Sequence, residues 1–324
     1  MRSIQRTRLC LFLPVFVAIF MALAPRTASA QTVRSGPVEA RLVASETSVQ
    51  PGRPFLVALS LSMDPDWHVY WKNPGDSGLP TTLDWELPAG FTSGKLQWPV
   101  PERFESGGLV TYGYSGQVLL MTEILPPRTV QAGTPLVLKA RAGWLACRVE
   151  CTPGKASLEL PLPVKADTPT TDQRWARSFT EAKSMIPSSA TSAHLSATAD
   201  SRTITLVGSG SPPPIAGLSR FYPDAPGQVK VSAPQAVMAD GASARLTLQR
   251  EPGAPQLKKL SGLLVTAGFA TRSAIEVDVP VSQAAGAAGL IATLLLAFVG
   301  GVVLNLMPCV LPMFLHERCC RIVF

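Results

Sequence analysis

Residues 136–164 read LVLKARAGWLACRVECTPGKASLELPLPV, a stretch in which apolar and polar side chains alternate on both sides of two cysteines. A two-residue period is typical of strands with one buried face. The apolar positions are Leu136, Leu138, Ala140, Ala142 and Trp144 before the cysteines, and Leu158, Leu160, Leu162 and Val164 after them. Cys147 and Cys151 lie between the two runs, and the turn-forming sequence Thr152-Pro153-Gly154 follows. The stretch therefore predicts a β-hairpin with both cysteines near its tip.

The same alternation occurs earlier in the chain, as in the run Phe55, Val57, Leu59, Leu61 and Met63. Clusters such as Gln50-Pro51-Gly52 and Asn73-Pro74-Gly75 separate the strand patterns. Many short strands divided by proline and glycine indicate a β-sandwich. We assign this sandwich to residues 31–168.

A helical linker and a second β-domain are predicted after the sandwich. Residues 169–189 contain Trp175, Phe179, Ala182 and Ile186 at helical spacing, with Asp172 as a candidate cap. Strand patterns then resume over residues 190–283, most clearly at Ile275, Val277, Val279 and Val281. One continuous β-structure is the alternative to a second, smaller β-domain. The predicted fold class is mostly β in either case.

The first thirty residues have the features of a secretory signal peptide. Arg2, Arg6 and Arg8 precede an apolar stretch, and Ala28-Ser29-Ala30 forms a small-residue cleavage site. An uncleaved anchor helix is the alternative, but the apolar stretch is short and Pro14 interrupts it. The sequence thus predicts a chain that begins at Gln31 and faces an oxidising compartment.

A single transmembrane helix is predicted over residues 287–315. Gly289 to Leu315 contains no Asp, Glu, Lys or Arg, and a span needs roughly 20 mainly apolar residues. Arg318 and Arg321 follow it, which places the C-terminus in the cytoplasm and residues 31–284 outside. Cys309 lies between two prolines of this segment, a position that suggests a reactive thiol lining a protein-enclosed cavity.

The charge balance gives no indication of nucleic-acid binding. The formal net charge is +7, and removing the four arginines of the signal peptide leaves +3, with both signs mixed along the chain. The sequence also contains no glycine-rich phosphate loop and no Gly-x-Ser-x-Gly elbow, so a nucleotide-dependent or hydrolytic enzyme is disfavoured. We expect no cofactor.

Only Cys147 and Cys151 of the six cysteines belong to the exported globular part, so each is the other's available partner there. They could form a structural staple or a redox pair. Closing so short a loop stabilises a fold by roughly 2 kcal/mol, which argues against stapling as the main purpose. A pair on a loop is open to attack by an incoming thiolate. The intramembrane Cys309 favours the redox interpretation.

No metal site is predicted. A copper or zinc site needs several converging ligands, and the exported part holds only two histidines, His68 and His194. Packing or a surface hydrogen bond is the better interpretation of His68.

Four motifs together resemble one known family: residues 67–80 (WHVYWKNPGDSGLP), 98–103 (WPVPER), 112–114 (YGY) and Trp144-Leu145-Ala146-Cys147 with Cys151. They resemble the periplasmic amino-terminal region of bacterial thiol:disulfide interchange proteins of the DsbD family, with the branch called suppressor of copper sensitivity protein B (ScsB) as the closer match. The run Asn305-Leu306-Met307-Pro308-Cys309 resembles the first helix of that family's membrane domain.

The resemblance implies an immunoglobulin-like sandwich and an electron relay. In the family, cytoplasmic thioredoxin reduces a membrane cysteine pair, and the reducing power passes to periplasmic thiol-disulfide proteins, including thioredoxin-like and isomerase clients. It implies that Cys147 and Cys151 are the redox pair, with Cys151 in mixed disulfides, and that Cys309 is one of two membrane-domain cysteines. Phe104 would cap the pair, although an ordinary loop aromatic is an open alternative. Roles in copper tolerance or cytochrome c biogenesis follow from the same resemblance.

The sequence departs from the family after Phe314. Residues 316–324 do not continue the membrane domain, so we expect an aberrant cytoplasmic tail in a truncated or frameshifted chain that cannot complete the relay alone. Cys319 and Cys320 are then accidental residues rather than a redox or metal pair. A non-enzymatic periplasmic binding or copper-handling module, with a structural disulfide, is the alternative function.

Overall fold

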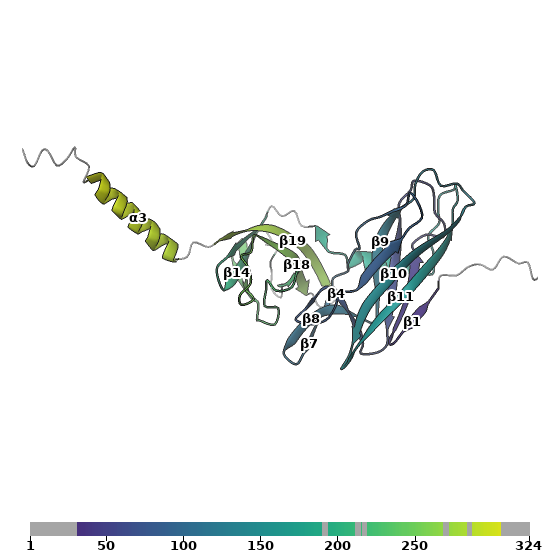
Figure 1. Cartoon of the computed structure of the whole chain (residues 1–324), viewed down its shortest axis with the longest axis horizontal. Coiled ribbons are helices and arrows are strands. Elements are labelled where there is room, and N and C mark those ends of the chain that lie inside the picture. Colours follow the sequence, from purple (N-terminus) through teal and green to yellow (C-terminus); the bar gives the residue numbers. More distant parts are fainter. Residues whose placement is uncertain are drawn as a thin grey trace, which may run out of the picture. The chain divides into compact units, whose positions relative to one another are not determined.

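The computed structural model describes residues 31–189, 194–210, 215, 219–267, 272–283 and 287–305, and strands dominate it (Figure 1). The mostly β fold class is confirmed. The chain forms two compact units, each built from separate segments. In the described part, the first unit comprises residues 31–69, 81–97 and 114–184, and the second comprises residues 70–80, 98–113 and the described residues from 185 onward.

The first unit contains an antiparallel five-stranded sheet with the order β1-β2-β3-β9-β6. Its strands are β1 (Val33–Ser35), β2 (Val38–Ala44), β3 (Phe55–Met63), β6 (Thr92–Ser93) and β9 (Gln117–Leu125). The alternating pattern of residues 55–63 is confirmed as β3, in which Val57, Leu59 and Leu61 are completely buried.

A second group of strands in this unit contains the predicted hairpin. It consists of β5 (Thr82–Glu86), β10 (Pro135–Cys147), β11 (Cys151–Pro163) and the first two residues of β4 (His68–Gly75). Leu138 and Leu158 bury their side chains, while Lys139 and Glu159 between the buried positions form an exposed ion pair at 2.6 Å. One apolar face on each strand therefore supplies core, as the period predicts.

The helix expected within residues 169–189 is present as α2 (Ala176–Ser184), which buries Phe179 and Ala182. Asp172 does not cap the first turn of this helix. The Asp172 carboxylate instead accepts a hydrogen bond at 3.1 Å from the backbone N–H of Arg174, and the carbonyl of Trp175 accepts the N–H of Phe179. Asp172 thus stabilises the turn at residues 173–175, which directly precedes the helix.

The second unit contains an eight-stranded sheet with the order β15-β18-β19-β13-β14-β17-β16 and with β12 beside β19. Its strands are β12 (Ser188–Ser189), β13 (Leu195–Ala199), β14 (Thr203–Ser209), β15 (Ser219–Pro223), β16 (Ala236–Asp240), β17 (Ser243–Gln249), β18 (Lys259–Ala267) and β19 (Arg272–Gln283). The predicted patterns at residues 204–206, 246–248 and 275–281 are confirmed as β14, β17 and β19. Val229 forms only an isolated bridge, with Arg250.

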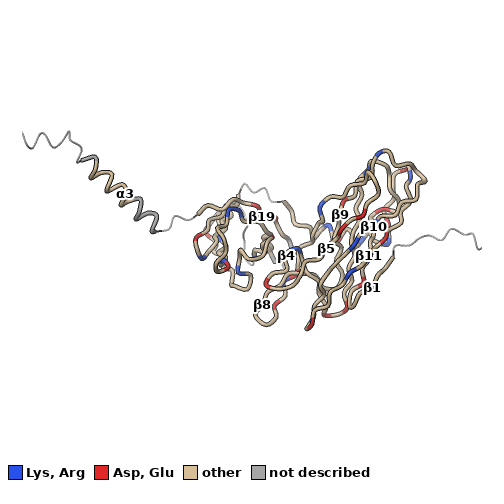
Figure 2. The backbone as a smooth tube through the Cα atoms, viewed as in Figure 1, with Lys and Arg blue, Asp and Glu red and all other residues tan. Residues whose placement is uncertain are grey.

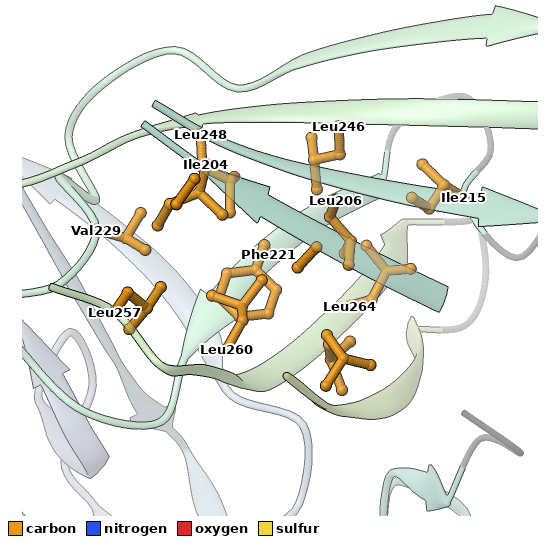
Figure 3. Packing of buried hydrophobic residues seen from close by; sticks show 14 of the residues in the cluster. Ile204, Leu206, Ile215, Phe221, Val229, Leu246, Leu248, Leu257, Leu260 and Leu264 are labelled. Carbon is orange, nitrogen blue, oxygen red and sulfur yellow. The ribbon is translucent and has the colours of Figure 1, made fainter. Parts of the chain in front are cut away.

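Buried aliphatic side chains from this sheet surround the ring of Phe221 (Figure 3). Ile204, Leu246 and Leu260 are among the completely buried members of this cluster. The second unit therefore has a hydrophobic core of its own.

Two segments from the first half of the chain belong to this second unit: residues 70–80 and residues 98–113. They contribute most of β4 together with β7 (Glu102–Ser106) and β8 (Leu109–Ser115). The buried amide of Asn73 donates a 2.7 Å hydrogen bond to the carbonyl of Pro223, and the rings of Tyr112 and Tyr222 lie 4.4 Å apart. The Lys72 ammonium group pairs with Asp224 at 2.7 Å.

The helix α3 (Ala287–Asn305) falls within the stretch predicted to span a membrane (Figure 1). Among the described residues, however, no helix has the combined length and apolar character required for a membrane span, so the transmembrane helix predicted over 287–315 is not found. The description of this helix ends at Asn305. The signal peptide at 1–30, Cys309 and the tail at 316–324 lie outside the described residues.

Candidate functional site

Cys147 and Cys151 form the last residue pair of the β10–β11 hairpin, which confirms the predicted hairpin. The strands pair without a bulge from Pro135↔Pro163 to Cys147↔Cys151. Cys147 and Cys151 are joined by a disulfide with an S–S distance of 1.99 Å and a Cα–Cα distance of 4.1 Å. Three residues, from Arg148 to Glu150, close the loop, and the Arg148 N–H donates to the Glu150 carbonyl at 3.1 Å.

The two cysteine residues of the pair differ in their exposure to solvent. The Cys147 residue is only 3% exposed, whereas Cys151 is exposed and the loop residue Val149 is 92% exposed. Cys147 is enclosed because β11 lies on one side of it and the start of β4 lies on the other. Cys151 lies on β11, at the edge of the sheet. An incoming thiolate can therefore approach Cys151 far more readily than Cys147.

His68, the first residue of β4, and Trp67 before it lie beside the cysteine loop. His68 is directly opposite Cys147 in the antiparallel register, and Val69 is opposite Ala146. The guanidinium carbon of Arg148 lies 5.6 Å from the ring centroid of Trp67, within the range of a cation–π contact. Sequence spacing alone does not group His68 with the cysteines, because only the strand register brings the two segments together.

Gly154 lies within β11 rather than in the predicted turn at Thr152-Pro153-Gly154. It is opposite the buried Trp144, and a Cβ atom on Gly154 would overlap the indole ring. The glycine is therefore required for close packing of the ring, and the reversal of the chain occurs earlier, at residues 148–150.

The other predicted site residues, Phe104 and Cys309, do not lie in the described part of the first unit. Phe104 lies in β7 of the second unit, half-buried and opposite Thr111, so its role as a cap stays a prediction. Cys309 lies outside the described residues, so its role also stays a prediction. Within the described part of the chain, no group of three or more His, Cys, Asp or Glu side chains is arranged to hold a metal ion.

An open groove of about 960 Å³ lies elsewhere in the first unit, between β2 and the far ends of β10 and β11. The guanidinium carbon of Arg41 lies 4.9 Å from the ring centroid of Trp175 at this groove. The cysteine pair does not line it. Figure 2 shows Lys and Arg mixed with Asp and Glu along the described strands of both units.

Comparison with known proteins shows what the segment that carries the cysteine pair is similar to. Residues 39–163 match the family model described as "Thiol:disulfide interchange protein DsbD, N-terminal". A comparison with curated proteins finds no match. Among solved structures, the N-terminal periplasmic domain of ScsB from Proteus mirabilis is similar in fold, with a TM-score of 0.55 at 16% identity, covering 77% of this chain and 96% of that one.

The yeast GGA1 GAE domain also matches, at 11% identity over 41% of this chain and 99% of that one, but its TM-score is only 0.25. The family match includes the whole hairpin and both of its cysteines. Residues 39–163 are therefore similar to the N-terminal domain of DsbD-type thiol:disulfide interchange proteins, which supports a protein of the DsbD/ScsB type.

Proposed function

We propose that this chain is the periplasmic thiol–disulfide exchange module of a protein-disulfide reductase, with Cys147 and Cys151 as its redox pair. The observation that carries the proposal is the pairing of a buried cysteine with an exposed one at the tip of a hairpin within the family match. Its clients are periplasmic thiol-disulfide proteins, and a role in copper tolerance stays a prediction.

The exchange runs through one mixed disulfide. In the reduced chain, the Cys151 thiolate attacks a client disulfide, and one client sulfur leaves with the electron pair of the broken bond. The Cys147 thiolate then attacks Cys151, and the second client sulfur leaves. The client gains two electrons and two protons, and the chain is left with the Cys147–Cys151 disulfide.

The difference in exposure supports this assignment of roles. The attacking sulfur must reach a bond in another protein, which the exposed Cys151 can do at a loop of three residues. The resolving sulfur only has to reach its neighbour, so burial of Cys147 is compatible with its role. Burial of Cys147 also hinders a second client from competing for it.

Single-cysteine variants test the proposal. In the full chain, with Cys10, Cys309, Cys319 and Cys320 replaced by serine, Cys147→Ser leaves Cys151 as the single cysteine, and Cys151→Ser leaves only Cys147. We expect Cys151 to react with a small aromatic disulfide at least about ten times faster than Cys147, because thiol access controls exchange. The rate of release of the aromatic thiolate is the measurement.

The matched pair of variants controls for general effects of losing the disulfide, since both lack it. Equal and slow reaction of both thiols would reject the exchange role and leave the alternative, a binding module with a structural disulfide. A faster reaction at Cys147 would reverse the assignment of the two cysteines.

A further inference from the structure

The exchange proposed above creates a charge problem at Cys147. When an incoming thiolate attacks the exposed Cys151, the buried Cys147 sulfur leaves with the electron pair of the disulfide. Cys147 is only 3% exposed, and an anion without a partner is costly in such a place. A neighbouring group is therefore needed that can deliver a proton or a positive charge to this sulfur.

The strand register places an imidazole there. Cys147 is directly opposite Cys151 on one side and directly opposite His68 on the other. Directly opposed residues of antiparallel strands point to the same face, with Cβ atoms about 5 Å apart. Cys151, Cys147 and His68 thus form a row across three strands on one face of the sheet, entirely within the first unit.

We propose that His68 is the proton partner of Cys147 in disulfide exchange. This inference rests on the proposed function. When Cys151 is attacked, the electron pair of the disulfide moves to the Cys147 sulfur, and the imidazolium of His68 transfers its proton to it or balances its charge. In the reverse direction, neutral His68 accepts the proton of the Cys147 thiol, which then attacks Cys151. Histidine suits this task because its ordinary pKa lies close to neutral pH.

The other charged groups near this row are less well placed. Arg148 directs its guanidinium over the ring of Trp67, and Glu150 lies across the exposed loop from it. Asp66 precedes the strand by two residues and is exposed. None of the three is opposite Cys147 in the described registers, where its partners are Cys151 and His68.

A histidine titration by NMR tests the inference without changing the site. The chain has three histidines, so His194 and His316 serve as internal controls. The full chain, with Cys309, Cys319 and Cys320 replaced by serine, is titrated oxidised and after reduction by a phosphine. We expect the pKa of His68 to be higher in the reduced chain by about one unit, because a neighbouring thiolate favours the imidazolium. The pKa values of His194 and His316 should not change.

Two failures are distinguishable. If the phosphine does not reduce the disulfide in the folded chain, the proposed function itself fails. If reduction succeeds but the pKa of His68 is the same in both states, only this inference is overturned. As a second readout, His68→Gln should slow reduction of the disulfide by dithiothreitol about tenfold at pH 6 and flatten its pH profile, whereas His194→Gln should leave both unchanged.

Discussion

The alternation of apolar and polar residues does not distinguish Cys147 from Cys151, but the fold gives them different surroundings. Both belong to the odd-numbered positions of their strands, whose side chains face outward, yet Cys147 is buried and Cys151 is exposed. The cause is the neighbouring strand, because the start of β4 covers Cys147 and nothing pairs with β11 on its outer side at Cys151 among the described strands. Exposure, and with it the division of roles, depends on tertiary pairing.

At the same scale, the packing of Gly154 against Trp144 can be tested by substitution. Gly154→Ala should lower the stability of the chain by about 1–3 kcal/mol, because the new methyl group overlaps a buried ring that cannot move freely. The midpoint of urea unfolding measures the loss.

Gly94→Ala is the matched control for this substitution. A Cβ atom on Gly94 would lie 3.5 Å from the nearest atom, the carbonyl oxygen of Glu123, which is an ordinary contact. If both alanine variants have the same unfolding midpoint as the unchanged chain, the argument for close packing at Trp144 is wrong.

Residue types and spacing were sufficient to find the cysteine pair, because residues 31–283 contain no other cysteines. They were not sufficient to find His68. That residue lies 79 positions before Cys147, and its significance comes only from the β4–β10 register. With only two histidines in residues 31–283, the sequence favours packing or a surface hydrogen bond as the role of His68.

At the scale of elements, most strands follow from their two-residue period, and the errors occur at their ends. The sequence Thr152-Pro153-Gly154 has turn-forming residues, but the tighter loop at residues 148–150 reverses the chain instead. The helix α2 begins at Ala176, later than the candidate cap Asp172 implied. The ends of a helix or strand depend on a few competing hydrogen bonds. A periodic pattern therefore predicts where an element lies more accurately than it predicts its first and last residues.

The turn before α2 predicts a pH dependence of stability. The hydrogen bond from the side chain of Arg174 lowers the pKa of Asp172 below its ordinary value, although burial opposes this. Because the pKa is lower in the folded chain, the interaction stabilises the fold above pH 4 or so, and it is lost as pH falls through the lowered pKa. Asp172→Asn should therefore cost no more than about 1 kcal/mol at pH 7 and nothing at pH 2.

Thermal unfolding at a series of pH values measures this difference. Arg174→Gln is the matched control, since it removes the other partner and should give the same dependence on pH. If Asp172→Asn lowers the stability equally at pH 7 and pH 2, the charge of the carboxylate does not contribute to the stability of the fold.

At the scale of the whole molecule, the composition of the second unit could not be predicted from the sequence. Residues 70–80 and 98–113 lie within the family match at 39–163, yet they group with residues from 185 onward. Strand periodicity is a local signal, and it carries no information about distant partners. The buried Asn73, which bonds to Pro223, shows how a single polar contact links segments 150 residues apart.

The disulfide should contribute little to the stability of the whole chain. It closes a loop of only a few residues, for which the loop-length argument gives about 2 kcal/mol. We expect the double variant Cys147→Ala/Cys151→Ala to keep the far-ultraviolet circular dichroism of the unchanged chain and to unfold at a slightly lower urea concentration. Loss of the β-sheet spectrum in this variant would mean that the pair is a structural staple.

The central claim is that the Cys147–Cys151 disulfide exchanges electrons with other proteins, and its reduction potential tests this most directly. The full chain, with Cys10, Cys309, Cys319 and Cys320 replaced by serine, is equilibrated in thiol–disulfide buffers of known potential, and the reduced fraction is measured by thiol alkylation and mass spectrometry. We predict a potential well above about −300 mV, in the range of exchangeable disulfides. A potential below that value, typical of inert structural bridges, would contradict the proposed function.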